Sequence, residues 1–173
     1  MKKINLIILL LYSISIAAQT KLPSLFGDKK VLQQNKEVLI WGTDIPNTTI
    51  KISASWGKMV QIKTDKYGKW RTKINTLKAD KKLYELTISG SEKIIIKNVL
   101  FGEVWLCSGQ SNMEMPVKGF PNAPINGSNE IILNARNKNI RLFFTQRKAS
   151  LTPEEDVVGK WTEPTPIPVA EFS

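Results

Sequence analysis

The chain has 173 residues, with 25 Lys and Arg against 15 Asp and Glu, so its formal net charge is +10. It contains one cysteine, Cys107, and no histidine. This composition excludes an intrachain disulfide, a Cys–His zinc site and a catalytic Ser–His pair made within these residues. The acidic residues show no metal-ligand spacing, and we expect neither a metal nor a cofactor.

The positive charge is spread along the chain rather than clustered. Most of the excess is lysine in predicted strands and turns, at Lys51, Lys58, Lys63, Lys66, Lys69, Lys73 and Lys78. Surfaces that bind nucleic acid gather Arg and Lys on one face or along one helix. The pattern therefore favours a solvated lysine-rich surface, and we expect no nucleic-acid partner. Attraction to an acidic sugar is a second interpretation, which charge alone leaves open.

Residues 1–18 predict a secretory signal peptide. Lys2 and Lys3 form its basic start, residues 4–16 its apolar core, and Ala17 and Ala18 supply small residues for cleavage. A retained membrane anchor is disfavoured because the apolar run is shorter than the ~20 residues that a spanning helix needs. We expect export to the periplasm or the extracellular space, with no membrane span after cleavage. Loss of Lys2 and Lys3 leaves a net charge of +8.

Residues 22–97 predict short strands separated by turns. In residues 48–55, Ile50, Ile52 and Ala54 alternate with polar residues. Such alternation, with regularly spaced turns, is typical of an antiparallel β-sandwich. Three tryptophans lie in this region, Trp41, Trp56 and Trp70. They allow two interpretations, a sugar-binding platform or packing within the core, and packing is favoured.

Residues 99–107 form an apolar run that predicts a strand buried on both faces, with Cys107 as a small hydrophobic residue in it. A turn of small and polar residues follows, with the hydroxyl of Ser111 at its apex. Hydrolases present a nucleophilic serine in this way, next to backbone N–H groups that stabilise an oxyanion. The usual Gly-x-Ser-x-Gly pattern has Met113 in place of its second Gly, and an ordinary turn is the alternative interpretation. We expect the side chains of Gln110 and Asn112 to hold the turn through hydrogen bonds.

The rest of the chain predicts a small number of further elements. Residues 114–126 indicate a loop that would edge the cleft of an esterase. Residues 129–137 predict a short helix, and residues 140–145 a strand of an α/β sheet. The acidic run at residues 154–156 follows a proline and favours the start of a helical turn over a pair of acid–base carboxylates.

The segment 102–114, GEVWLCSGQSNME, resembles the start of the catalytic domain of sialate O-acetylesterases, which are carbohydrate esterases of the SGNH hydrolase group. Matching pieces occur on either side of it, at residues 25–28, 31–34, 40–42, 65–70, 139–143, 159–161 and 169–173. The resemblance implies that Ser111 is the catalytic nucleophile and that Gly109, Gln110 and Asn112 support the elbow and the oxyanion hole. It also implies a β-sandwich domain at residues 22–97, followed at residues 98–173 by the start of an SGNH-like α/β domain with a parallel sheet.

The family also needs residues that cannot be assigned in this chain. They are a Gly and an Asn that complete the oxyanion hole, and a late Asp-x-x-His that supplies the base. We therefore expect an N-terminal fragment of a longer enzyme that is truncated within the α/β domain and inactive on its own. Whether the natural gene continues past Ser173 into an Asp-x-x-His would test this.

The resemblance implies an exported serine esterase that removes O-acetyl groups from sialic acid or a related acetylated sugar. Two alternatives stay open. One is a non-catalytic carbohydrate-binding or accessory β-sandwich protein, and the other is an acetyl esterase that acts on plant polysaccharide. The expected partner is the acetylated sugar substrate, and the oligomeric state is not predicted.

Overall fold

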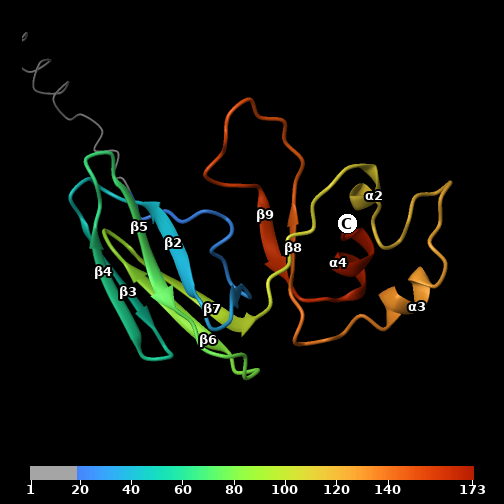
Figure 1. The fold of residues 1–173 in the computed structure, drawn as a ribbon, viewed down its shortest axis with the longest axis horizontal. Coiled ribbons are helices and arrows are strands. Elements are labelled where there is room, and N and C mark those ends of the chain that lie inside the picture. Colours follow the sequence, from blue (N-terminus) through green and yellow to red (C-terminus); the bar gives the residue numbers. More distant parts are fainter. Residues whose placement is uncertain (1–18) are drawn as a thin grey trace, which may run out of the picture.

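The computed structural model describes residues 19–173, so the predicted signal peptide at residues 1–18 lies outside the described residues. Most of the regular structure is β-strand (Figure 1). The strands are β1 (Val31–Gln33), β2 (Glu37–Thr43), β3 (Thr49–Ala54), β4 (Lys58–Lys63), β5 (Lys69–Asn75), β6 (Tyr84–Ser89), β7 (Lys93–Gly102), β8 (Leu142–Thr145) and β9 (Gly159–Thr162). The helices are α2 (Ser111–Glu114), α3 (Ser128–Leu133) and α4 (Pro166–Glu171). Within residues 19–173, no helix has the length and apolar character needed to cross a membrane.

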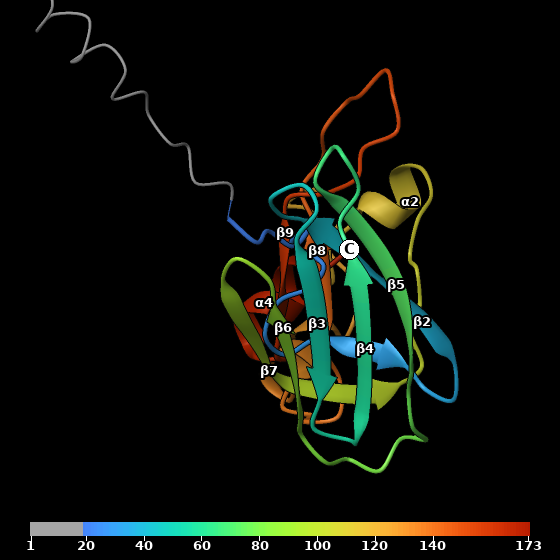
Figure 2. The same cartoon turned by 90° about the vertical axis from the view of Figure 1, so that its left-hand side faces the viewer.

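Seven of these strands form two sheets that curl around a common core. A five-stranded sheet has the order β1-β7-β6-β3-β4, and β2 pairs with β5 in a second sheet. The turn between β4 and β5 carries the chain from the first sheet to the second, so that β4 and β5 lie side by side (Figure 2). All strand pairs in the described part are antiparallel except β1 with β7. The fold is therefore mostly β, with a curled sheet.

The core contains side chains from both sheets. Ile40 and Ile74 come from the two-stranded sheet, Ile52 and Ile88 from the five-stranded one, and all are at most 2% exposed. The prediction that Ile50, Ile52 and Ala54 share one buried face is confirmed in β3, where alternate residues point inward. This alternation follows from the pleat of a strand, which sends successive side chains to opposite faces.

β7 links the curled sheet to the rest of the chain. Its residues up to Val99 pair antiparallel with β6, and its last residues pair parallel with β1. The register with β6 is irregular near Asn98, which has a φ of +59°. Asparagine tolerates this left-handed conformation better than most residues, and the irregularity bends the strand. β7 thus continues past residue 97, where the sequence predicts the end of the first domain.

The predicted buried strand at residues 99–107 is wrong beyond Gly102. Val99 and Phe101 are buried in β7, but Trp105 is 84% exposed, Leu106 is 92% exposed, and Cys107 is exposed. The neighbouring strand β1 is short and its last paired residue, Gln33, lies opposite Gly102. Because no backbone partner among residues 19–173 pairs with the chain after that point, the strand ends there.

The segment after Gly102 differs from the prediction in three further ways. The strand expected at residues 140–145 is present as β8, but it pairs antiparallel with β9 in a separate two-stranded sheet. The helix expected at residues 129–137 is the shorter α3, which follows Gly127 at a φ of +77° and has no side-chain cap. The acidic run at residues 154–156 forms no helical turn and lies in the connection between β8 and β9 (residues 146–158).

A joint of aromatic and lysine side chains connects this segment to the curled sheet. The carbonyl oxygen of Leu25 accepts hydrogen bonds from Trp161 Nε1 and from Lys30 Nζ, both at 2.9 Å. The Lys30 ammonium also lies 4.5 Å from the ring centre of Phe26 and 5.5 Å from that of Trp161. Lys30 is only 5% exposed, and this burial lowers the pKa of its ammonium to about 8. A buried cation therefore lies between the two parts of the chain.

Candidate active site

Glu103 fixes the start of the segment that leads from β7 to Ser111. Its carboxylate accepts hydrogen bonds from Gln33 Nε2 at 2.8 Å and from Gln34 Nε2 at 2.7 Å. These two bonds lower the pKa of the Glu103 carboxyl below its ordinary value. Gln33 also accepts a bond from the Val104 N–H at 2.8 Å. Side chains at the end of β1 therefore replace the missing strand partner and anchor the segment.

The turn that carries Ser111 is held by its backbone. The Met113 N–H donates to the Gln110 carbonyl at 2.9 Å, and Ser111 begins the short helix α2. A Cβ added at Gly109 would lie 2.6 Å from Met113 Cγ, so the close approach of the two residues requires a glycine unless Met113 moves. Met113, which stands where the usual pattern has its second glycine, thus packs against Gly109, the first glycine of the pattern. Gln110 and Asn112 make no side-chain hydrogen bond with the described residues, so the expected stabilisation of the turn by their side chains is not present.

Ser111 is exposed, and its hydroxyl makes no hydrogen bond to a described side chain. The nearest acidic residue along the chain, Glu114, ends α2 and forms an ion pair with Arg147 at 2.5 Å. The described residues include no group of three or more His, Cys, Asp or Glu side chains that could hold a metal ion. The described part of the chain therefore presents the Ser111 hydroxyl on an exposed turn, next to backbone N–H groups.

The three tryptophans pack as the favoured interpretation predicts. Trp70 is 3% exposed, and Trp41 and Trp56 are partly buried against the core. Trp56 Nε1 donates to the Asn75 carbonyl at 2.9 Å, and its ring lies edge-on to Phe101 with centres 5.0 Å apart. Trp41 also borders an open pocket, so packing and surface exposure are combined in this one residue.

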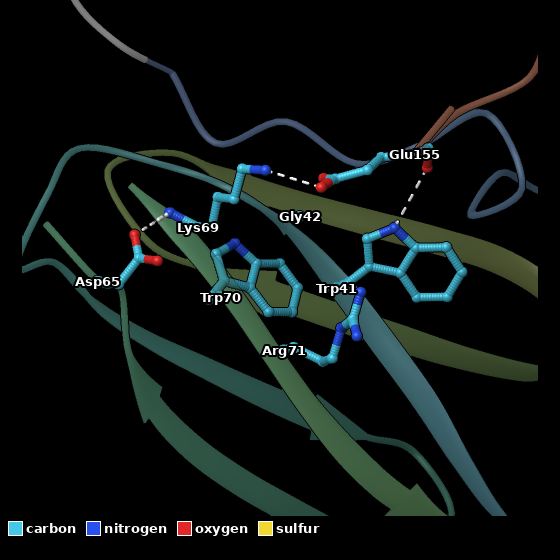
Figure 3. Close-up of a pocket in the computed structure, with 7 residues that line it drawn as sticks. All are labelled: Trp41, Gly42, Asp65, Lys69, Trp70, Arg71 and Glu155. Carbon is cyan, nitrogen blue, oxygen red and sulfur yellow. Dashed lines mark hydrogen bonds and ion pairs between the residues drawn. The ribbon is translucent and has the colours of Figure 1, made fainter. Parts of the chain in front are cut away.

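This pocket, called the Trp41 pocket below, lies on the β2–β5 sheet (Figure 3). Its volume is about 210 Å³. Its lining residues are Trp41, Gly42, Asp65, Lys69, Trp70, Arg71 and Glu155. The sequence does not mark Asp65, Lys69, Arg71 or Glu155 as residues of a binding site. The strand register places Arg71 opposite Trp41, a pairing that follows from the β2–β5 hydrogen bonds. No sequence pattern predicts that Glu155 lies beside this sheet, because its partner Lys69 is 86 positions away along the chain.

Comparison with known proteins adds independent information. No family model matches the chain. Sialate O-acetylesterase from Mus musculus is 28% identical over 175 residues, which are 94% of this chain and 32% of the relative. The Homo sapiens enzyme of the same name is 28% identical over 156 residues, or 82% of this chain and 29% of the relative.

A solved structure extends the comparison to the fold. The crystal structure of a carbohydrate acetylesterase from Xanthomonas citri matches with a TM-score of 0.79 at 30% sequence identity, over 88% of this chain and 34% of that one. The chain is a homologue of sialate O-acetylesterases. The resemblance inferred from residues 102–114 is therefore confirmed, and the curled β fold is similar to that of a carbohydrate acetylesterase. The chain spans about a third of the length of these sialate O-acetylesterases.

Proposed function

We propose that this protein is a serine esterase that removes O-acetyl groups from sialic acid or a related acetylated sugar, with Ser111 as its nucleophile. One observation supports this most directly: the exposed Ser111 lies on a tight turn shortly after the buried end of β7. Relatives of this chain carry the names sialate O-acetylesterase and carbohydrate acetylesterase. A fixed strand followed by an exposed hydroxyl suits attack on an ester carbonyl.

The proposed reaction has two steps. Ser111 Oγ attacks the acetyl carbonyl carbon, and a base takes the hydroxyl proton and returns it to the departing sugar oxygen. Water then hydrolyses the acetyl–serine ester to acetate and restores the hydroxyl. The Ser111 N–H contributes one hydrogen bond to the oxyanion, and Gly109 allows the close turn that exposes it. Because these 173 residues contain no histidine, a histidine outside them would act as the base.

The proposal also includes the organisation inferred from the resemblance. Residues 1–18 direct export, residues 22–97 form a β-sandwich domain, and residues 98–173 begin an SGNH-type α/β domain. The 173-residue chain alone is then catalytically incomplete, while the full-length product is active. The partner is an acetylated sugar, and no cofactor takes part.

The test is turnover of a chromogenic acetyl ester by the full-length product, its Ser111→Ala variant and a Ser108→Ala control. Ser108 is also exposed and lies in the same segment, so its loss changes a hydroxyl without removing the proposed nucleophile. Ser111→Ala is expected to lower kcat at least about a thousandfold, as removal of a serine nucleophile does in other hydrolases. The Ser108→Ala variant is expected to stay within about threefold of wild type, since the substitution leaves the nucleophile in place.

Equal activity of Ser111→Ala and wild type would reject Ser111 as nucleophile. A second assay compares acetate release from O-acetylated sialic acid and from acetylated xylan. Preference for xylan would replace the sialic-acid proposal by the plant-polysaccharide alternative. The non-catalytic alternative has one specific observation in its favour, the Trp41 pocket, and predicts no turnover of any acetyl ester.

A further inference from the structure

The Trp41 pocket has an aromatic wall whose position is fixed by packing. The rings of Trp41 and Phe26 meet edge-to-face, with centres 4.7 Å apart and planes at 84°. Trp41 Nε1 donates a long hydrogen bond of 3.4 Å to the Glu155 carbonyl. A rigid aromatic side chain at the edge of a hollow offers an apolar face to a ligand without a large loss of side-chain entropy.

The pocket also contains a buried donor without a protein partner. Trp70 is 3% exposed and lines the pocket, and its Nε1 has no hydrogen-bond partner among the described residues. In Figure 3 the nitrogen-bearing edge of Trp70 lies on the side of Lys69 and Glu155, and its benzene ring lies towards Trp41. Buried N–H groups in native proteins are almost always paired. The Trp70 N–H is therefore a donor that the described residues leave unpaired beside the pocket.

The charged lining residues leave both a donor and an acceptor available. Lys69 and Glu155 form an ion pair at 2.7 Å across the pocket. One carboxylate oxygen of Asp65, Oδ1, accepts bonds from the N–H groups of Tyr67 and Lys69, both at 2.8 Å. No hydrogen bond to Asp65 Oδ2, and none from the Arg71 guanidinium, occurs within residues 19–173. Opposite charges in equal number suit hydroxyl groups, which both donate and accept.

We propose that the Trp41 pocket binds one sugar ring of a saccharide, with an apolar face of the ring against Trp41 and its hydroxyl groups on Arg71 and Asp65. The volume of about 210 Å³ is below the ~300–1,000 Å³ of pockets that enclose a whole ligand, so one ring of a longer chain fits better. The choice of a saccharide as ligand rests on the proposed function, whereas the site itself rests on the geometry above.

The same connection between β8 and β9 contacts both this pocket and the Ser111 turn. Glu155 reaches Lys69 in the pocket, and Arg147, at the other end of the connection, pairs with Glu114 at the end of α2. A saccharide held in the pocket would therefore lie beside a segment that also contacts the proposed catalytic turn. This places the pocket as a secondary subsite of the esterase rather than as an unrelated surface feature.

The test uses the full-length protein and two glycans without acetyl esters, the acidic sialyllactose and the neutral xylotetraose, so that hydrolysis plays no part. Titration calorimetry would measure binding by wild type, Arg71→Gln and the matched control Lys73→Gln. Lys73 is exposed on β5 like Arg71 but does not line the pocket. Wild type is expected to bind one of the glycans, Arg71→Gln about tenfold more weakly, and Lys73→Gln within about twofold of wild type.

The result that overturns the proposal is absence of saturable binding to both glycans, or equal weakening by the two substitutions. Both substitutions are at exposed positions, and a melting curve for each variant would show that the fold is retained. Binding that weakens with added salt identifies an acidic sugar as ligand, and salt-independent binding a neutral one. Glycan binding without ester turnover would reject the proposed esterase function and support the proposed sugar site. Ester turnover without glycan binding would support the esterase function and reject the sugar site.

Discussion

The two halves of the molecule differ in where their apolar side chains lie. In residues 20–102, fourteen hydrophobic side chains are buried, and they run from Phe26 to Phe101. In residues 103–173 the large apolar side chains are at least partly exposed, and Leu106 and Leu151 are almost fully so. The first half therefore has its own core, whereas the second half holds Ser111 on a lightly packed surface.

The contrast places the packed core and the candidate site in different parts of the chain. Sites that bind or react are often on loops that a rigid scaffold positions. Here Phe101, the last residue but one of β7, is buried in the core, and the bonds from Gln33 and Gln34 to Glu103 hold the segment that follows. The packed half can thus fix where the segment with Ser111 starts, without burying the serine.

Truncation of one large apolar side chain in each half tests this contrast and has the largest expected effect. Ile88 is 0% exposed and Leu106 is 92% exposed. Ile88→Ala is expected to lower the free energy of unfolding by about 2–5 kcal/mol, through lost burial and a residual cavity. Leu106→Ala is expected to change it by no more than about 0.5 kcal/mol. Urea unfolding followed by tryptophan fluorescence measures both, and comparable losses would show that the second half is packed as well.

The joint at Lys30 predicts a pH dependence of intermediate size. The pKa of the ammonium falls from 10.5 to about 8 on burial, so between these values the unfolded chain binds more protons than the folded one. Stability contributed by this group therefore rises with pH from about 8 to 10.5, by at most about 3 kcal/mol. Below pH 8 both states are protonated and the contribution is flat.

Lys30→Met keeps the aliphatic stem and removes the charge, so it should abolish this rise. The comparison is the difference in unfolding free energy between wild type and variant at several pH values, because other groups titrate in both proteins. Lys51→Met is the matched control, since Lys51 is exposed in β3 and should leave the rise unchanged. Parallel pH profiles of wild type and Lys30→Met would show that the ammonium is hydrated in solution.

The smallest effect is expected at the ion pair between the two halves. In the wild type, the Glu155 carboxylate pairs with Lys69 and raises the pKa of the Lys69 ammonium. Glu155→Gln removes this negative charge. Because both partners are exposed, Tm is expected to fall by no more than about 2 °C. Faster proteolytic cleavage within residues 146–158 is the expected sign of a loosened connection. Glu154→Gln is the control, because Glu154 pairs with Lys148 inside the same connection. Equally faster cleavage of both variants would show that the Lys69–Glu155 ion pair does not hold the connection in place.

The features that were predicted correctly depend on residues that are close together in the sequence. Alternation of Ile50, Ile52 and Ala54 identifies a strand and its buried face because the pleat repeats every second residue. Residues of small size around Ser111 indicate an exposed turn for a similarly local reason. The family resemblance rests on the same short segment, and the similarity to known acetylesterases confirms it.

The features that were missed depend on distant partners. The strand after Val99 looked continuous to Cys107, but its end is set by the short length of β1. The strand expected at residues 140–145 was placed in the sheet of an α/β domain, but the observed strand β8 pairs antiparallel with β9. The Trp41 pocket depends on contact between Lys69 and Glu155, which composition and periodicity do not encode. The position of Ser111 was therefore predictable, whereas the surroundings of the Trp41 pocket were not.

The exposure of Cys107 gives this protein a natural attachment point for a spectroscopic probe. It is the one cysteine of the 173 residues and lies four positions before Ser111. Within these 173 residues a maleimide-linked fluorophore would therefore react at one known place, close to the proposed nucleophile. Its emission would report how the segment between β7 and α2 responds when substrate arrives, and its quenching by a labelled sugar would measure the approach of the ligand directly.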